Sequence, residues 1–445
     1  MLKRRFAILL TVIYMAFLAS SVSFAGTMPI SGANAAEPDS GVDIVIGNEA
    51  GVASKVPAPE ISAPSAILVE AETGQILYEK ESRIPLHISA ACKIMTTLVA
   101  IENADLSSYV TVSSDSARPE GSALNLEIGA KYKLTDLLYA TMLTSANDTA
   151  LAIADHVSSG KIDRFIDKMN ETAARLGMHN THFANPTGLL DIRQFTTAED
   201  FALLIKYAIK NPTFNSLFSA RSRPWYGTGS RPEILTNSNQ LFWSYEGVEG
   251  GKVGYNNKDQ QTVVSTALRT NVKLICVVLD APETTMYTDA TTLFDYGFSN
   301  FWKSTLVSKG ELLKTADLDG KPIRLISQSD IMYMHPIGEN YIREFTSTAE
   351  LTLPLKTTIP AGTATYILDD GTEVNISLYP ETEIIPPDDT WTKFRKSIVD
   401  NKDIFILIIV LLVFEGILLL FNLGKLFGKL YTYLMNRSSQ KRRID

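Results

Sequence analysis

Apolar and polar positions recur with two different periods along the chain, and these periods predict its elements. Two short apolar runs, 66–69 and 76–78, flank a polar turn and predict a β-hairpin where ordered structure begins. Residues 94–101 are largely apolar, which predicts a buried helix. Apolar residues between 162 and 176 recur every three or four positions and stop before Gly177, so we expect an amphipathic helix with a glycine at its C-terminal end.

Strand patterns return in the second half of the chain. Residues 261–266 and 273–279 are β-rich runs with residues 269–271 between them, which predicts two strands. The pattern changes near 301–310, and from there only short strand-like runs occur, at 323–326, 349–353, 363–367 and 374–378. The sequence therefore predicts a mixed α/β (α+β) domain followed by a small all-β domain.

The N-terminal segment has the pattern of a secretory signal peptide. Three basic residues, Lys3 to Arg5, precede an apolar stretch at 6–19, and small-residue cleavage candidates follow at 23–25 and 33–35. An uncleaved N-terminal anchor is the alternative. Residues 26–60 are rich in Ala, Gly, Ser and Pro, which is typical of a flexible spacer.

Near the C-terminus, residues 404–421 are apolar apart from Glu415 and a few small breaks. Their length is close to the minimum of about 20 residues that crosses a bilayer. An ionised carboxylate at the middle of a membrane costs about 2.5 kcal/mol or more. Basic residues follow the run, as in a stop-transfer helix with a cytoplasmic tail. An amphipathic helix on the membrane surface is the alternative, but the run is too uniformly apolar to favour it.

These patterns predict an exported, single-pass membrane protein whose main domains are extracytoplasmic. The predicted boundaries are a signal peptide at 1–35, a spacer at 36–60, the α/β domain at 61–303, the β domain at 304–387, a linker at 388–402, a transmembrane helix at 403–423 and a basic tail at 424–445.

Composition excludes several functions. The net charge of −8 argues against nucleic-acid binding, which needs clustered basic residues. Two cysteines in 445 residues do not make a disulfide framework. His179 and His182 have no acidic or thiol partners in a familiar metal-binding pattern, so neither a metal nor another cofactor is expected.

Three short segments carry candidate chemistry. They are Ala90-Ala91-Cys92-Lys93, Ser145-Ala146-Asn147 and Lys252-Val253-Gly254. Their order and spacing resemble the Ser-x-x-Lys, Ser-x-Asn and Lys-Thr-Gly motifs of penicillin-binding proteins and serine β-lactamases. Their surroundings resemble the serine D-alanyl-D-alanine carboxypeptidases in particular, over roughly residues 62 to 300, through the segments 74–78, 134–138, 185–189 and 197–200.

The resemblance implies a β-lactamase-like fold, an antiparallel sheet flanked by helices, and a role for each motif residue. Lys93 stands at the position of the base, and Ser145 and Asn147 relay protons and orient the substrate amide. Lys252 and Gly254 belong to the strand that binds the terminal carboxylate. No nucleophile is present, because Ala90 occupies the serine position. Val253 occupies the threonine position and lacks its hydroxyl group.

Losing a nucleophile costs a comparable serine hydrolase on the order of a million-fold in rate. Ser89 could replace it only if the local turn is rebuilt, because a shift of one helical position rotates the hydroxyl by about 100°. Cys92 sits beside the base and is expected to pack in the core. Lys93, Ser145 and Asn147 could also remain simply as a buried hydrogen-bonded cluster.

We therefore expect a protein of peptidoglycan metabolism that is catalytically impaired and binds stem peptides or a cell-wall partner protein. Two alternatives stay open. One is an active D,D-carboxypeptidase that uses Ser89, and the other is a structural role in which the β domain spaces an interaction surface from the membrane. Retention of Lys252 separates the first hypothesis from the structural one.

Overall fold

The computed structural model describes residues 42–45, 56–227, 232–255, 260–337, 341–368, 371–386 and 390–441. The predicted signal peptide at 1–35 lies outside these residues. The chain divides into two compact units. The first comprises Met1–Lys314, Ile326–Thr348 and Thr363–Leu378, and the second comprises Thr315–Leu325, Ala349–Gly362 and Tyr379–Asp445.

The candidate site is built on a five-stranded antiparallel sheet in the first unit. Its strand order is β3-β2-β10-β9-β8, so β8 is an edge strand. The predicted hairpin at 66–78 is confirmed, and the strands predicted at 261–266 and 273–279 are present and pair with each other. Thr270 and Asn271 join β9 to β10 with φ angles of 48° and 65°, as a two-residue hairpin turn requires. The strands are β2 (Ser65–Glu70), β3 (Ile76–Lys80), β8 (Val248–Tyr255), β9 (Gln261–Arg269) and β10 (Val272–Ala281).

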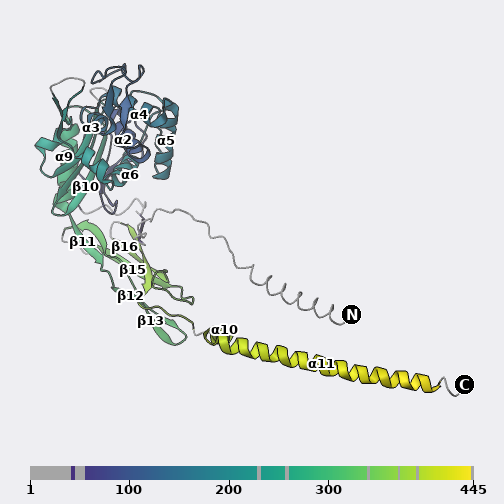
Figure 1. Cartoon of the computed structure of the whole chain (residues 1–445). Helices are drawn as coiled ribbons and strands as arrows, with labels where there is room; N and C mark the ends of the chain where they lie inside the picture. Colours follow the sequence, from purple (N-terminus) through teal and green to yellow (C-terminus); the bar gives the residue numbers. More distant parts are fainter. Residues whose placement is uncertain are drawn as a thin grey trace. The chain divides into compact units, whose positions relative to one another are not determined.

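Helices cover both faces of this sheet (Figure 1). Because side chains alternate along a strand, Ile67 and Val69 of β2 pack in one apolar cluster and Ala66 and Leu68 in the other. The first cluster contains helices α2 (Lys93–Asn103), α3 (Leu134–Thr144), α4 (Asn147–Ser158), α5 (Ile162–Arg175), α6 (Ala198–Ala208) and α7 (Pro212–Phe218). The second contains α8 (Leu241–Ser244) and α9 (Met286–Asn300).

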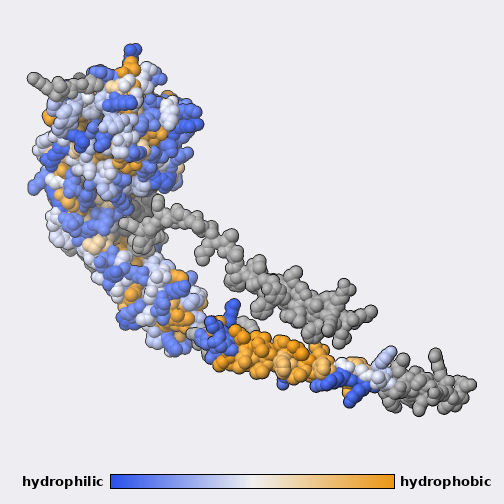
Figure 2. All heavy atoms as spheres, in the orientation of Figure 1, coloured by the Kyte–Doolittle hydropathy of each residue, from blue (hydrophilic) through white to orange (hydrophobic). Residues whose placement is uncertain are grey.

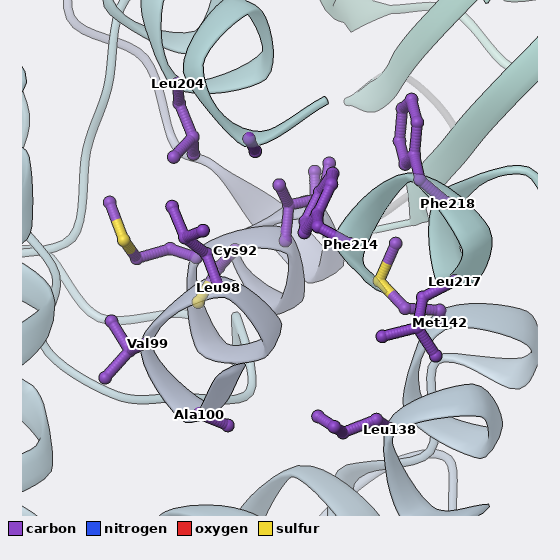
Figure 3. Packing of buried hydrophobic residues seen from close by; sticks show 14 of the residues in the cluster. Cys92, Leu98, Val99, Ala100, Leu138, Met142, Leu204, Phe214, Leu217 and Phe218 are labelled. Carbon is purple, nitrogen blue, oxygen red and sulfur yellow. The ribbon is translucent and has the colours of Figure 1, made fainter. Parts of the chain in front are cut away.

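Helix α2 runs through the middle of the first cluster, as its apolar sequence predicts. Leu98 on α2 lies among side chains of neighbouring helices, including Leu138, Leu204 and Phe214 (Figure 3). Full burial of such a side chain contributes about 1.5–3 kcal/mol. The packing fixes α2, and with it the polar residues at its N-terminal end.

The end of α5 shows how the sequence stops a helix. Gly177 has a φ angle of 77°, which glycine adopts without steric cost. The N–H of Met178 donates to the carbonyl of Ala173 at 2.9 Å, and the N–H of Gly177 donates to that of Ala174 at 3.1 Å. These two bonds make a Schellman motif, which confirms the predicted C-terminal cap.

Two small two-stranded antiparallel sheets adjoin the helices of the first unit. β4 (Tyr109–Thr111) pairs with β5 (Lys131–Lys133), and β6 (Ser222–Trp225) pairs with β7 (Glu233–Thr236).

After α9 the described residues up to Pro380 form strands and no helix. β11 (Phe301–Val307) pairs with β14 (Ile331–Pro336), and β1 (Val42–Val45), within the predicted spacer, pairs with β17. The remaining strands are β12 (Leu312–Leu318), β13 (Lys321–Ile326), β15 (Ile342–Ala349), β16 (Gly362–Leu368) and β17 (Glu373–Pro380). The all-β character predicted for this region is confirmed.

The predicted strand at 349–353 is wrong. The strand here is β15, which ends at Ala349 where we expected a strand to begin. Most residues of β15 are polar and exposed, so the apolar pattern did not reveal it. Pro354, which follows the expected strand, has no N–H to donate to a ladder.

Two helices close the described chain. α10 (Thr390–Asp400) lies within the predicted linker, and α11 (Lys402–Lys441) follows it. Residues Lys402–Thr432 are long and apolar enough to cross a membrane, and an 18-residue window within them has a mean hydropathy of 3.2 with no part buried. Figure 2 shows the apolar surface of this helix as a continuous band.

Candidate active site

The Ser-x-Asn motif forms the sharp connection between α3 and α4. Only Ser145 and Ala146 separate the two helices. Ser145 caps α3 with φ and ψ angles of 60° and 23°, in the left-handed region. Such a conformation is uncommon for a residue other than glycine and marks a position held by its surroundings. Here it turns the chain so that Ser145 and Asn147 lie beside the strand and helix described next.

Lys252 reaches this connection from the edge strand β8. Its Nζ donates to Ser145 Oγ at 2.6 Å and to the carbonyl oxygens of Thr141 and Met142 at 3.1 Å each. An ammonium group has three protons to donate, so these three acceptors satisfy it. The side chain is fully buried, and burial, together with the nearby charge of Lys93, holds the pKa of Lys252 well below its ordinary value.

Two glycines let β8 lie close against its neighbours. A Cβ atom on Gly250 would lie 2.4 Å from the ring of Phe218, and one on Gly251 would lie 2.1 Å from Asn239 Nδ2. Neither position can accept a side chain without displacing its neighbours. The glycines before Lys252 therefore set the depth at which this lysine enters the site.

Val253 does not share the surroundings of Lys252. Consecutive strand residues point to opposite faces of a sheet. Val253 is fully buried in the apolar cluster that also contains Leu241 and Phe242, while Lys252 points toward α3. The position that matches the family's threonine thus contributes an apolar contact here. Gly254 follows on the same strand and is also buried.

Lys93 stands at the first position of α2. Its Nζ donates to Asn147 Oδ1 at 2.7 Å and also to the carbonyl oxygen of Thr187. Burial lowers the pKa of Lys93 to about 8, partly opposed by the negative potential of Cys92 and Asp148. Among ion pairs between described residues, neither Lys93 nor Lys252 has a carboxylate partner. Two buried lysine side chains therefore share one site with no ion pair to a carboxylate among the described residues.

Asn147 links Lys93 of α2 to the chain segment that precedes α3. Its Nδ2 donates to the carbonyl of Glu120 at 2.7 Å, which leaves Oδ1 to accept from Lys93. Its backbone N–H donates to the carbonyl of Ser122 at 2.7 Å. The neighbouring Asp148 accepts from the N–H of Leu124 at 3.1 Å. The amide of Asn147 is thus fixed in one orientation.

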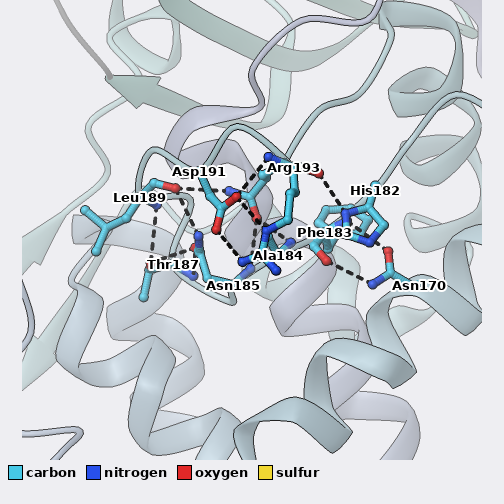
Figure 4. A network of polar contacts seen from close by, with 10 residues as sticks. Asn170, His182, Phe183, Ala184, Asn185, Thr187, Leu189, Asp191 and Arg193 are labelled. Carbon is cyan, nitrogen blue, oxygen red and sulfur yellow. Dashed lines mark hydrogen bonds and ion pairs between the residues drawn. The ribbon is translucent and has the colours of Figure 1, made fainter.

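The loop at 185–189 supplies the second acceptor of Lys93. Asn185 Oδ1 accepts from the N–H groups of Thr187 and Gly188 at 3.1 and 2.8 Å, and Nδ2 donates to the carbonyl of Leu189 at 3.0 Å (Figure 4). An asparagine that bonds its own loop in this way holds a turn rigid. The loop thereby holds the Thr187 carbonyl toward Lys93.

Sequence reasoning missed these backbone acceptors. The carbonyl groups of Thr187, Glu120, Thr141 and Met142 act through the main chain, so the identities of their side chains give no signal. The segment 185–189 was noticed only as part of the resemblance. Its Asn-Pro-Thr-Gly composition is a turn signal that could have indicated a rigid loop.

The first motif is the part of the site that departs from expectation. Ser89–Cys92 form a 3₁₀ helix, η1, and the α-helix begins only at Lys93, so the α-helical rotation of about 100° assumed for Ser89 does not describe this turn. Ser89 has a φ angle of 54° and is 2% exposed. Its N–H donates to His87 Nδ1 at 3.2 Å. Among described residues, neither Ser89 Oγ nor His87 Nε2 has a hydrogen-bond partner.

Cys92 is fully buried and donates through Sγ to the carbonyl of Asn185 at 3.2 Å. Burial raises the pKa of the Cys92 thiol to about 12, which disfavours the reactive thiolate. The geometry agrees with a packing role. Within the described residues, no group of three or more His, Cys, Asp or Glu side chains could hold a metal ion.

The arrangement has a definite chemical capacity. Lys93 and Asn147 make one hydrogen-bonded pair and Lys252 and Ser145 make another, contributed by α2, α4, β8 and the α3–α4 turn. A lysine with a lowered pKa can accept a proton, and one that is desolvated can bind an anion strongly. A fold with these three motifs defines a penicillin-binding type of site.

Comparison with known proteins gives the family. Residues 52–283, more than half of the chain, match the model of the D-alanyl-D-alanine carboxypeptidase family, peptidase S11. The chain therefore belongs to this family. It is 31% identical over 287 residues to the D-alanyl-D-alanine carboxypeptidase DacF of Bacillus subtilis, covering 62% of this chain and 74% of that protein.

Solved structures agree on the fold. The Streptomyces K15 DD-transpeptidase superposes with a TM-score of 0.52 at 30% identity and covers 55% of this chain and all of its own. Penicillin binding protein 5 from Haemophilus influenzae superposes with a TM-score of 0.65 at 24% identity, covering 74% of this chain and 99% of that one. The second likeness, which covers more of this chain, concerns the fold alone.

Proposed function

We propose that this chain binds D-alanyl-D-alanine stem peptides of peptidoglycan without cleaving them at a normal rate. The observation that carries the proposal is Ala90 at the nucleophile position, directly before the Lys93 helix. A methyl group cannot attack a carbonyl carbon. Removing the nucleophile from a comparable serine hydrolase lowers kcat on the order of a million-fold.

The retained cations support a binding role. Lys93 and Lys252 are buried together, and both have lowered pKa values because burial disfavours their charge. A carboxylate that entered the site would relieve this cost by pairing with them. The C-terminal carboxylate of a stem peptide is such a group. A cell-wall protein that offers a carboxylate is the other occupant that this chemistry suits.

The same proposal includes placement at a membrane. Helix α11 would anchor the chain, and the Bacillus subtilis relative named above is a D-alanyl-D-alanine carboxypeptidase by its name. The N-terminal pattern of a signal peptide supports export of the folded units. Stem peptides would then be within reach of the site at the outer face of the membrane.

Covalent labelling tests the catalytic part of the proposal. The full chain in detergent is incubated with a reporter penicillin and its intact mass measured, and D-alanine release from a pentapeptide is followed in parallel. We expect neither adduct nor release, while an active family enzyme in the same assay gives both. An adduct mapped to Ser89 would replace the proposal with an active carboxypeptidase that uses a shifted nucleophile.

Peptide titration tests the binding part. In the proposal Lys252 exchanges one of its three protein acceptors for the peptide carboxylate. Lys252→Ala would then remove one partner of a buried charged contact, which costs about 2–5 kcal/mol, or roughly 30-fold or more in affinity. Lys206→Ala is the control outside the site, because Lys206 is a partly buried lysine that donates to the carbonyl of Thr73. Lys252→Met keeps the side-chain volume if the alanine variant is unstable. Unchanged affinity in a folded Lys252 variant would refute the binding role.

A further inference from the structure

One face of α11 carries polar residues at a regular spacing within its apolar surface. Leu412, Glu415, Leu419, Asn422 and Leu426 follow one another at alternating intervals of three and four residues. This is the heptad spacing of a helix that packs against a second helix in a left-handed pair. All five line a single groove along the helix. The polar side chains therefore lie on one face of the helix. We call this face, formed by the five residues, the seam.

Glu415 lies inside the apolar run and is unfavourable to leave facing lipid, and Asn422 stands directly after that run on the same face of the helix. Both are exposed, and no hydrogen bond between described residues satisfies either side chain. Polar groups in the hydrocarbon core are costly and face protein or water rather than lipid. The nearest basic residue on α11 after Glu415 is Lys425, ten positions later, about 15 Å along the axis at 1.5 Å per residue. It cannot reach Glu415.

The seven-residue separation of Glu415 and Asn422 indicates which partner fits. Two copies of one chain insert in the same orientation, so their helices pair in parallel and each seam position meets its own counterpart. An amide group is both donor and acceptor, and so is a neutral carboxyl group, which makes each able to bond its own copy. A single polar residue at such a seam position fixes register and the number of helices.

We propose that α11 pairs with α11 of a second copy of this chain, in parallel, with Glu415 and Asn422 at the seam. The proposal rests on the membrane placement proposed above. Association in the membrane would be held by interhelical hydrogen bonds and packing, since lipid removes the hydrophobic drive between helices. A different protein with a basic residue in its span is the rival partner, and the test separates the two.

Cysteine crosslinking in membranes of cells that express the full chain provides the test. Single substitutions Leu412→Cys and Leu419→Cys place thiols on the seam, and Val410→Cys and Ile417→Cys place them on the opposite face of the same helix. The native Cys92 and Cys276 are buried, and the unsubstituted chain measures their background. We expect disulfide-linked dimers of twice the chain mass at positions 412 and 419, and little product at 410 and 417.

A second set of variants tests the polar groups. In the Leu419→Cys background, Asn422→Leu or Glu415→Leu should lower the dimer yield about threefold or more, as loss of one interhelical hydrogen bond of about 0.6 kcal/mol or more implies. Glu415→Gln keeps a donor and an acceptor and should retain the dimer.

Three results would overturn the pairing. They are equal crosslinking on both faces, no crosslinking at all, and a product whose mass requires a different protein. Alkaline extraction of the same membranes separates this failure from that of the placement. A chain that washes off was not anchored by α11, whereas a retained chain without seam crosslinks is anchored but unpaired. Stem-peptide binding, measured separately, is independent of both.

Discussion

The wall of the site built by α3, α4 and β8 contrasts with the wall built by η1 in how its polar groups are paired. Lys252 meets three acceptors, and Asn147 uses both atoms of its amide. In η1 and at His87 just before it, buried polar groups lack such partners within the described chain. Ser89 Oγ and His87 Nε2 are buried without a partner among the described residues, and the Ser89 backbone is in the left-handed region.

In an active enzyme of this family, one site would both bind the substrate and attack it, and the two walls differ in which of these tasks they suit. Under the proposed function, the paired wall would receive a substrate and its carboxylate. The unpaired wall includes the position that matches the family's serine, where this chain has Ala90. Satisfied polar networks are rigid, whereas unsatisfied ones are costly to the fold. The contrast agrees with the proposal that the site binds a stem peptide without cleaving it.

Restoring the hydroxyl is the strongest way to break this contrast. Ala90→Ser places a nucleophile directly before the Lys93 helix, and we expect penicillin acylation to rise by about a thousandfold or more over the unaltered chain. This is a fraction of the million-fold that a nucleophile supplies, because Val253 still lacks its hydroxyl group. Intact mass after timed incubation measures the rate.

The double variant Ala90→Ser with Lys93→Met is its control, because the new serine then has no base. The gain should disappear while the fold, checked by circular dichroism, remains. If Ala90→Ser alone gives a folded protein without an adduct, then the paired wall is not arranged for catalysis, and Lys93 serves the fold only.

The buried charge of Lys93 predicts a pH dependence of stability. Its pKa is about 8 in the folded chain, against 10.5 ordinarily, so between these values the unfolded chain binds more protons. Stability from this group therefore rises with pH from about 8 to 10.5, by roughly 3 kcal/mol at 1.36 kcal/mol per pKa unit. Denaturant unfolding of the detergent-solubilised chain and of Lys93→Met should show the difference between them growing by this amount. Parallel pH profiles would mean that Lys93 is not desolvated.

The smallest predicted effect concerns the unpaired wall. Ser89→Gly removes a left-handed strain of roughly 1–2 kcal/mol and an unpaired hydroxyl, so we expect the free energy of unfolding to rise by about 1 kcal/mol. Ser216→Gly, inside α7, is the matched control and should lower it by about 0.5–1 kcal/mol. A Ser89→Gly variant that is less stable than the unaltered chain would show that the Ser89 hydroxyl has a stabilising partner.

Much of the fold could be predicted because burial follows the period of each element. The helix at 94–101 and the strands at 261–266 and 273–279 are confirmed within a few residues. β15 escaped prediction because its side chains are mostly exposed, and its stability comes from neighbouring strands that no local pattern reveals.

The candidate site was predictable to the level of its side chains. Lys93, Ser145, Asn147 and Lys252 come together as the motifs implied. The main-chain acceptors could not be predicted from the sequence, because every residue has a carbonyl group. Only the folded loops determine which carbonyl groups face a lysine. The left-handed Ser89 also escaped, because serine gives no local signal for that conformation.

The polar surroundings of Lys93 have a consequence at the level of the gene. Every alanine codon becomes a serine codon by a change of its first base, so position 90 is one mutation from a hydroxyl group. Position 253 is farther away, because a valine codon needs two changes to encode threonine. A serine at position 90 would restore the Ser-x-x-Lys pattern three residues before Lys93, whose hydrogen bond to Asn147 is already in place. A single base change is therefore enough to introduce a serine at position 90. If alanine persists there in laboratory-evolved populations, selection maintains it, and sequencing of those populations can measure this.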